Sequence, residues 1–259
     1  MKVFCPQCKS SLTGPMAALG TRVNCPECRH SFYWTDRQHA GETFVVYDLE
    51  TTGLDPEQDE FIQIAAMRFT AGSLCPGETF ASFARPRRPI SSFIESYTGV
   101  GNRHVADAKR PEEVLCEFAN WSGDATLIAH NGLRFDSKFL AATCRRHGMP
   151  MREVHSIDSI HMSKMLFGKT RGTGHSLDHL ISRLRIDSKD IRRHDARGDV
   201  EILGRAVAGM WQRLGLDHAF NGVPRHGAFL PVDRIQLRQT KDLIIRHQPI
   251  PGLGDEVSF

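Results

Sequence analysis

VVYDLETTGL, residues 45–54, is the stretch that decides the fold, because an apolar run ends there in two carboxylates and a turn. Side chains of a strand alternate between its two faces, so Asp48 and Glu50 should project together while Leu49 turns into the core. Two negative charges this close repel each other unless a cation is bound, and oxygen ligands suit Mg2+ or Mn2+ better than zinc. A strand that runs out into a solvated acidic turn would explain the same triplet.

Two later stretches contain residues of the same chemical kind. They are His130-Asn131-Gly132-Leu133-Arg134-Phe135-Asp136 and His194-Asp195-Ala196-Arg197-Gly198-Asp199. In order and spacing, D-x-E-T-T-G, H-N-x-x-x-F-D and H-x-x-x-x-D resemble the DnaQ-like (DEDDh) 3'→5' exonuclease family over residues 43–212. Three motifs in this order are a specific signal, which a single motif would not be. The resemblance implies an α/β fold in which an RNase H-like mixed sheet is flanked by helices.

The resemblance also implies the catalytic residues. Four carboxylates are enough to hold two Mg2+ or Mn2+ ions about 3.5–4 Å apart for a displacement at phosphorus. These carboxylates are Asp48, Glu50, Asp136 and Asp199. His194 corresponds to the general base of the family, since an imidazole with a pKa of about 6.5 can deprotonate water near neutral pH.

Substrate binding is expected in two of the three motifs. The residues are Thr51, Thr52, Gly53, Leu54, His130 and Asn131. In similar exonucleases the segment 51–54 receives the terminal nucleotide, and a side chain like Leu54 wedges against its base. Simple packing is the alternative for Leu54. His130 comes at the end of an expected strand, so we predict a positioning role for it rather than that of a base.

The first 36 residues carry a different metal-binding pattern. Cys5 and Cys8 are separated by sixteen residues from Cys25 and Cys28, which is typical of a closed tetrahedral site of four cysteines. So short a segment depends on its metal to fold, and we predict one structural Zn2+ in a small N-terminal zinc ribbon. A thioredoxin-like redox role would need a βαβ context that this segment lacks. The aromatic run 32–34 would either stack on bases or form the core of the ribbon.

Composition places the chain in an ordinary class. Its 259 residues are 40% hydrophobic and 24% charged, with a net charge of +3, which permits a nucleic-acid partner without requiring one. No apolar run approaches the roughly 18 residues of a membrane span, and no hydrophobic signal region precedes Cys5. Four of the seven cysteines lie in CxxC pairs, which favours a reducing compartment. We therefore expect a cytoplasmic protein that has no membrane partner.

The order of elements follows from periodicity and from proline positions. We expect strands over 43–50, 61–69, 78–84, 125–130 and 154–158, and helices over 111–121, 134–147, 159–167, 176–184 and 196–214. Asp136 and Asp199 then fall in the first turns of two helices. The basic segment 85–89, with two prolines, is an exposed loop that is either solvated or contacts phosphate. Residues 232–248 would form a helix or an edge strand.

These observations predict three parts: the zinc ribbon over 1–36, an exonuclease domain over 43–214 behind a polar linker, and a tail of unknown role over 215–259. The predicted activity is metal-dependent removal of nucleoside monophosphates from the 3' end of DNA, at single-stranded or frayed ends. One alternative is a 3'→5' exoribonuclease. Another is a catalytically inactive zinc-ribbon protein that binds nucleic acid or acts as an adaptor. The expected partner is nucleic acid with a free 3' end, and the ribbon or the tail offers a place for a protein partner.

Overall fold

A mixed six-stranded sheet forms the centre of the protein in the computed structural model, which describes residues 2–5, 8, 10–13, 22–33, 43–70, 73–168, 174–216 and 220–232. Its strands are β5 (Phe44–Thr51), β6 (Phe61–Thr70), β7 (Ser73–Phe83), β8 (Thr126–Ala129), β9 (Met151–Asp158) and β10 (Arg225–Pro231). They lie in the order β10-β9-β8-β5-β6-β7. The neighbours β5–β8 and β8–β9 run parallel, and the other pairs are antiparallel. The predicted mixed sheet is confirmed.

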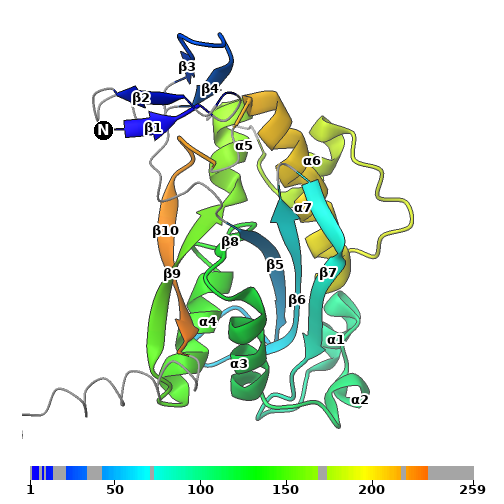
Figure 1. Ribbon diagram of the computed structural model, residues 1–259. Helices are drawn as coiled ribbons and strands as arrows, with labels where there is room; N and C mark the ends of the chain where they lie inside the picture. Colours follow the sequence, from blue (N-terminus) through cyan, green and yellow to red (C-terminus); the bar gives the residue numbers. More distant parts are fainter. Residues whose placement is uncertain are drawn as a thin grey trace, which may run out of the picture.

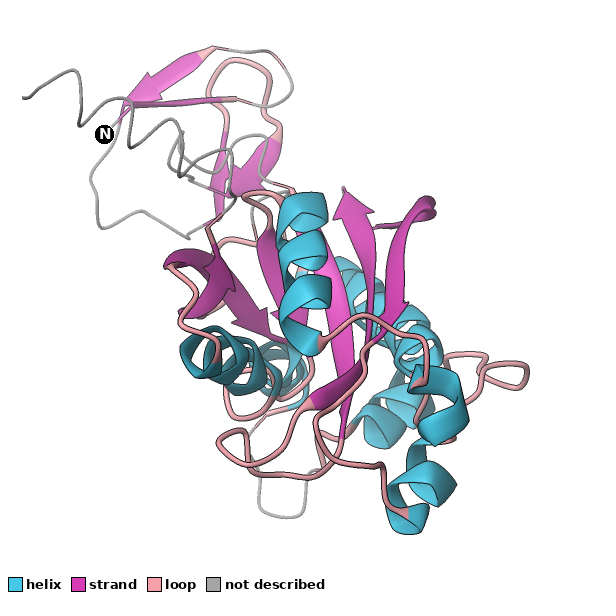
Figure 2. Ribbon diagram, turned by 90° about the horizontal axis from the view of Figure 1, so that it is seen from below, coloured by secondary structure: helices cyan, strands magenta, loops and turns pink. Residues whose placement is uncertain are grey.

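Helices cover both faces of this sheet (Figures 1 and 2). The described helices are α1 (Ser92–Thr98), α2 (Asn102–Val105), α3 (Pro111–Ser122), α4 (Asp136–Arg146), α5 (Ser159–Phe167), α6 (Leu177–Leu184) and α7 (Ala196–Leu214), of which α3 to α7 cover the faces. One core cluster joins α3 and α4 to the sheet, and a second joins α5, α6 and α7 to it.

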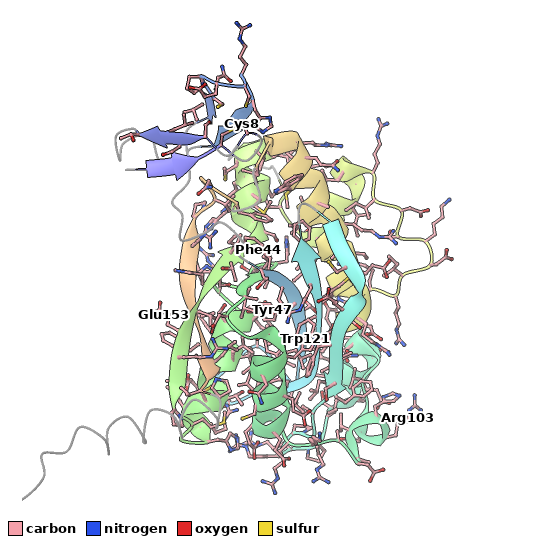
Figure 3. The ribbon with its side chains drawn as sticks, viewed as in Figure 1. Cys8, Phe44, Tyr47, Arg103, Trp121 and Glu153 are labelled. Carbon is pink, nitrogen blue, oxygen red and sulfur yellow. The ribbon has the colours of Figure 1, made fainter. Side chains whose placement is uncertain are left out.

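The central strand β5 supplies alternate residues to the two clusters. Val45, Tyr47 and Leu49 pack in the α3–α4 cluster, whereas Phe44 and Val46 pack in the α7 cluster. Phe44 and Tyr47 lie inside the molecule, while Arg103 and Glu153 lie on its outside (Figure 3). The same alternation continues toward the end of β5. Its two carboxylates therefore point toward the α7 side of the sheet.

Most expected elements occur close to their expected bounds, but three were missed. Helices α1 and α2 are too short to show a periodic pattern, and β10 is recognisable only by its pairing with β9. The sheet therefore extends beyond residue 214, where the predicted exonuclease domain ended. Trp34, the linker and the segment 233–259 lie outside the described residues, and with them most of the segment 232–248. Among the described residues, no helix has both the length and the apolar character of a membrane span.

The expected basic loop 85–89 lies between β7 and α1. Its Arg87 is held by the buried carboxylate of Glu60, which accepts from the Arg87 backbone N–H at 2.7 Å and from Nε at 3.1 Å. The neighbouring Arg88 is exposed. Arg87 therefore has a structural partner in the protein, which neither surface interpretation of the loop anticipated.

Candidate active site and cysteine cluster

The residues predicted for catalysis and substrate binding line one cavity of about 570 Å³. They reach it from five places in the chain: the end of β5, the turn after it, the loop after β8, the start of α4, and the segment that leads into α7. The lining residues are Asp48, Glu50, Thr51, Thr52, Gly53, Leu54, His130, Asn131, Asp136, His194 and Asp199, with Phe93 and Tyr97 of α1 among the others. The cavity thus collects residues that are up to 151 positions apart, from Asp48 to Asp199 (199 − 48).

Three of the four acids meet most closely. One carboxylate oxygen from each of Asp48, Glu50 and Asp199 lies within 4.8 Å of the other two. Asp136 is not in this trio but lines the same cavity and is only 2% exposed. The backbone groups of Asp136 itself and of Leu49 lower the pKa of this carboxyl and so oppose part of the rise that burial causes.

Gln63 fixes the start of α7 against β6. It lies opposite Glu50 in the β5–β6 register and is 2% exposed. Its Nε2 donates to Asp195 Oδ1 at 3.1 Å, and its Oε1 accepts from the Ala196 backbone N–H at 3.1 Å. Asp199 then follows in the first turn of α7. Gln63 was not predicted as part of the site, although an amide within a mostly apolar strand was an available signal.

Asp158 performs the same task for the loop after β8. Its Oδ1 accepts from the backbone N–H groups of Asn131 and Ile160, both at 3.0 Å, and it is 4% exposed. Asn131 has a φ of +63°, a left-handed conformation that asparagine adopts more readily than most residues. His130 contacts Ser159, the residue after Asp158, since its Nδ1 lies 2.8 Å from Ser159 Oγ. Asp158 was expected only as the last residue of a strand.

Burial and mutual repulsion disfavour the ionised acids. Burial first, then the charges of Asp136, Glu50 and Asp199, raises the pKa of Asp48 well above its usual range. Burial, Asp199 and Asp195 raise the pKa of Glu50 to about 8, and burial raises the pKa of Asp136 to about 7. The pKa of Asp199 is also raised by burial, although Arg193 opposes the shift. Ionised carboxylates crowded in this way are a donor set suited to hard divalent cations.

His194 lies beside the acids, two residues before the start of α7. Its φ is +58°, and its backbone N–H donates to Asp199 Oδ2 at 3.2 Å. Its imidazole packs on the ring of Tyr97, with ring centroids 4.2 Å apart. Burial lowers the pKa of the other expected histidine, His130, to about 4, so this side chain is neutral near pH 7. His194, unlike His130, packs on an exposed aromatic ring.

Apolar side chains form the outer wall of the cavity. Leu54 is 84% exposed, Phe93 is 74% exposed and Tyr97 is 55% exposed, and all three line the cavity. The rings of Phe93 and Tyr97 are nearly parallel, with an interplanar angle of 8°. The side chain of Leu54 is therefore not part of the protein core. Such a surface offers apolar faces to a flat ligand.

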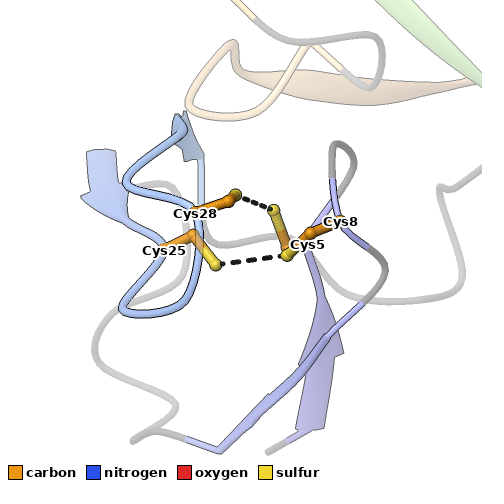
Figure 4. A group of neighbouring side chains, drawn as sticks. All are labelled: Cys5, Cys8, Cys25 and Cys28. Carbon is orange, nitrogen blue, oxygen red and sulfur yellow. Dashed lines mark hydrogen bonds between the residues drawn. The ribbon is translucent and has the colours of Figure 1, made fainter.

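Four sulfur atoms meet in the N-terminal segment (Figure 4). The pairs come from two hairpins, β1 (Lys2–Phe4) with β2 (Ser11–Thr13) and β3 (Arg22–Asn24) with β4 (Ser31–Tyr33). The sulfurs of Cys5, Cys8, Cys25 and Cys28 all lie within 4.8 Å of one another. A hydrogen bond with Ser10 lowers the pKa of the Cys25 thiol to about 6. The seven cysteines are all described, and none of them forms a disulfide. Four sulfurs so arranged are a donor set that fits zinc.

Comparison with known proteins agrees with this geometry. The RNase_T family model, described as an exonuclease, matches residues 45–207. The match begins after the four cysteines and so does not bear on them. The DNA polymerase III PolC-type of Bacillus cereus is 33% identical over 171 residues, which is 66% of this chain and 11% of that protein. The chain thus spans about a tenth of the length of this curated relative.

Two solved structures share the fold. One is the nuclease domain of 3'hExo, a DEDDh family member, bound to rAMP. It has a TM-score of 0.58 and 21% identity, and the match covers 71% of this chain and 98% of that one. The other is exonuclease X in complex with 5' overhanging duplex DNA, with a TM-score of 0.55, 21% identity, and coverage of 68% and 96%. The expected RNase H-like exonuclease architecture is confirmed.

Proposed function

This chain belongs to the DnaQ-like (DEDDh) exonuclease family, and from that premise we propose that it removes nucleoside monophosphates from the 3' end of DNA. The observation that carries the proposal is the trio of carboxylate oxygens from Asp48, Glu50 and Asp199 within 4.8 Å, in one cavity with Asp136 and His194. A structural role alone gives no reason to crowd buried acids whose ionised forms are disfavoured. The raised pKa values support a site for cations.

The metal ligands in this proposal are the four acids. Asp48, Glu50, Asp136 and Asp199 would hold two Mg2+ or Mn2+ ions, which when bound stabilise the attacking and leaving oxygens of a displacement at phosphorus. Gln63 and Asp158 would keep α7 and the loop after β8 in place while this happens. Each of these two groups acts through the residues it holds, so both are positioning residues.

His194 would act as the general base. A ring nitrogen of its imidazole would take the proton of the attacking water, which a neutral imidazole can do near pH 7. The Tyr97 ring packs against the imidazole, and the Asp199 carboxylate accepts from the His194 backbone N–H, so both the ring and the backbone of His194 are fixed beside the acids. The neutral, partly buried His130 would position the loop instead.

The outer wall supports a substrate with unpaired bases. Leu54 would wedge against the terminal base, and Phe93 and Tyr97 would stack on exposed base faces, which paired bases inside a duplex do not offer. Thr51, Thr52, Gly53 and Asn131, which line the same cavity, would contact the terminal nucleotide. We therefore propose single-stranded or frayed 3' ends as the substrate. The PolC-type relative supports DNA, whereas the 3'hExo domain bound to rAMP supports the alternative of an exoribonuclease.

One assay tests this function. Single-stranded DNA, blunt duplex DNA and RNA, each labelled at the 5' end, are incubated with the full chain and Mg2+ or Mn2+, beside a covalently closed single-stranded DNA circle. Shortening from the 3' end with release of mononucleotides is expected on single-stranded DNA, and Asp48→Asn should abolish it. Asp124→Asn, which changes a surface carboxylate remote from the cavity, is the matched control. Preferred degradation of RNA would favour the alternative, cleavage of the circle would contradict exonuclease action, and inactivity on every substrate would favour the adaptor hypothesis.

We also propose that residues 1–36 form a separate zinc ribbon. The four sulfurs of Cys5, Cys8, Cys25 and Cys28 would bind one Zn2+, whose binding would supply the folding free energy of this segment. Free thiols of this kind persist in a reducing compartment, and on this basis we propose a cytoplasmic location. The ribbon would add affinity for nucleic acid or for a protein partner rather than chemistry.

A further inference from the structure

Arg193 makes contacts on both sides of its guanidinium group. Nη1 contacts Asp199 Oδ1, while Nε and Nη2 lie 3.2 Å and 3.1 Å from Asp178 Oδ1. The Asp199 side chain is 10% exposed and that of Asp178 is 74% exposed, with Arg193 between them at 24%. The arginine therefore bridges a proposed metal ligand and a surface carboxylate. Arg193 follows Arg192 in a basic stretch, so the sequence alone favours a solvated side chain and does not reveal this bridge.

The Arg193 charge compensates the acids. An arginine keeps its proton at any pH at which the protein is folded. Burial raises the pKa of Asp48, Glu50 and Asp199, and neighbouring acids raise it further for Asp48 and Glu50; the positive charge of Arg193 opposes the shift in all three. In the protein without bound metal, Arg193 therefore acts as a partial counter-ion for these acids.

Both oxygens of Asp199 are engaged. Oδ2 accepts from the His194 backbone N–H at 3.2 Å, and Oδ1 accepts from Arg193. The backbone donor is fixed by the turn that begins α7. The arginine is a long side chain with a second anchor at Asp178, so it can leave Asp199 without losing its other partner. Of the two donors, Arg193 is the one that can make room for a cation.

We propose that Arg193 is a displaceable counter-ion: it neutralises Asp199 when the site holds no metal, and a divalent cation must displace it toward Asp178 in order to bind. This inference rests on the proposed metal site. It adds that the affinity of the acids for Mg2+ or Mn2+ is set in part by competition with a residue of the same chain. Arg193 would thereby raise the metal concentration needed to fill the site while stabilising the metal-free protein.

The test measures Mn2+ binding to the full chain by calorimetry in the absence of nucleic acid. Arg193→Gln should bind Mn2+ about tenfold more tightly, because no charge-assisted contact has to be broken. Its melting temperature without metal should fall at the same time. Asp178→Asn should weaken Mn2+ binding, because the second anchor of the arginine then lacks a negative charge.

Arg197→Gln is the matched control. Arg197 lies in the first turn of α7 and is paired with a neighbouring carboxylate, since its Nη2 lies 3.0 Å from Asp195 Oδ2. It contacts none of the four proposed ligands in the described structure. Removing its charge should change Mn2+ affinity clearly less than Arg193→Gln does. If Arg197→Gln and Arg193→Gln gain the same Mn2+ affinity, the gain comes from the change in net charge alone. Displacement of Arg193 would then be overturned.

Unchanged or weaker Mn2+ binding by Arg193→Gln would also overturn the inference, and Arg193→Lys guards against a folding defect. Lysine keeps the charge but not the two-sided fork, so a gain in affinity smaller than that of the glutamine variant is expected. If the unsubstituted protein and Asp48→Asn bind Mn2+ equally poorly, the proposed metal site itself is wrong and this inference fails with it. The outcome could also be that the unsubstituted protein is an active nuclease and binds Mn2+, while the Arg193 variants bind Mn2+ with the same affinity. That outcome would reject this inference but leave the proposed metal site in place.

Discussion

His194 and Tyr97 are in ring contact, with centroids 4.2 Å apart and planes inclined at 32°. The contact joins the segment that leads into α7 to helix α1, a helix whose exposed residues also form the outer wall of the cavity. The proposed general base and the proposed base-stacking surface are therefore coupled. A substitution in the stacking surface should therefore also alter catalysis by His194.

The first prediction tests this coupling with Tyr97. Tyr97→Ala should lower kcat as well as weaken binding of single-stranded substrate, because the imidazole of His194 loses its neighbour. Tyr97→Phe keeps the ring and should retain most of the activity, so it serves as the control. Steady-state kinetics on a short labelled oligonucleotide separate the two parameters. A change in KM alone would mean that Tyr97 only binds substrate.

His194 itself is expected to carry proton transfer. His194→Ala should lower the rate by roughly 10²- to 10⁴-fold, the usual contribution of a general base. Mn2+ affinity, measured in parallel by calorimetry, should change little. His155→Ala alters an exposed histidine on β9 and is the comparison. A loss confined to metal affinity would show that His194 does not act as the base.

The raised pKa values predict how the stability of the metal-free protein depends on pH. Glu50 has a pKa of about 8 in the folded protein against about 4.3 in an unfolded chain, so the native state binds the extra proton between these values. Stability should therefore fall as pH rises from about 4.3 toward 8 in EDTA, and Glu50→Gln should flatten this decline. Melting temperatures across that range provide the measurement. Because Asp48 and Asp136 shift the same way, some decline should persist in the variant.

Gln63 is expected to matter for both stability and rate. Gln63→Leu keeps the approximate size of the side chain but leaves the buried Ala196 N–H without its partner, which should destabilise the fold by about 1–3 kcal/mol. Turnover should also fall, since the first turn of α7 carries Asp199. Gln212→Leu, at the exposed far end of α7, is the control. Equal stability of the two variants would show that the amide does not hold the helix.

The last prediction concerns the cysteine cluster. A protein that begins at Gly41 should keep its turnover on short oligonucleotides at saturation, because the proposed catalytic residues all lie beyond that point. It should bind longer substrates more weakly and with a shallower salt dependence if phosphate contacts have been lost. The full chain should carry one zinc by elemental analysis, and Cys25→Ser should lose it. A collapse of turnover in a truncated protein that still folds would show that the ribbon helps to build the active site.

The sequence by itself determined the local features on which the site depends. The alternation of β5 was enough to place Asp48 and Glu50 on one face, and strand-to-helix order was enough to put Asp136 and Asp199 in first turns. Both features depend on a few consecutive residues and on a fixed period. The two CxxC pairs were also enough to predict the meeting of four sulfurs, because each pair of cysteines is local and four thiolates are needed to close one tetrahedral site.

Only the tertiary structure decided which distant groups complete the site. Gln63, Asp158 and Tyr97 are joined to the predicted residues by contacts between elements far apart in the chain, and β10 exists as a strand only because β9 offers it an edge. The Arg193 bridge likewise depends on where α6 brings Asp178. No short-range period records such pairings, because they arise from the way the helices and the sheet pack together.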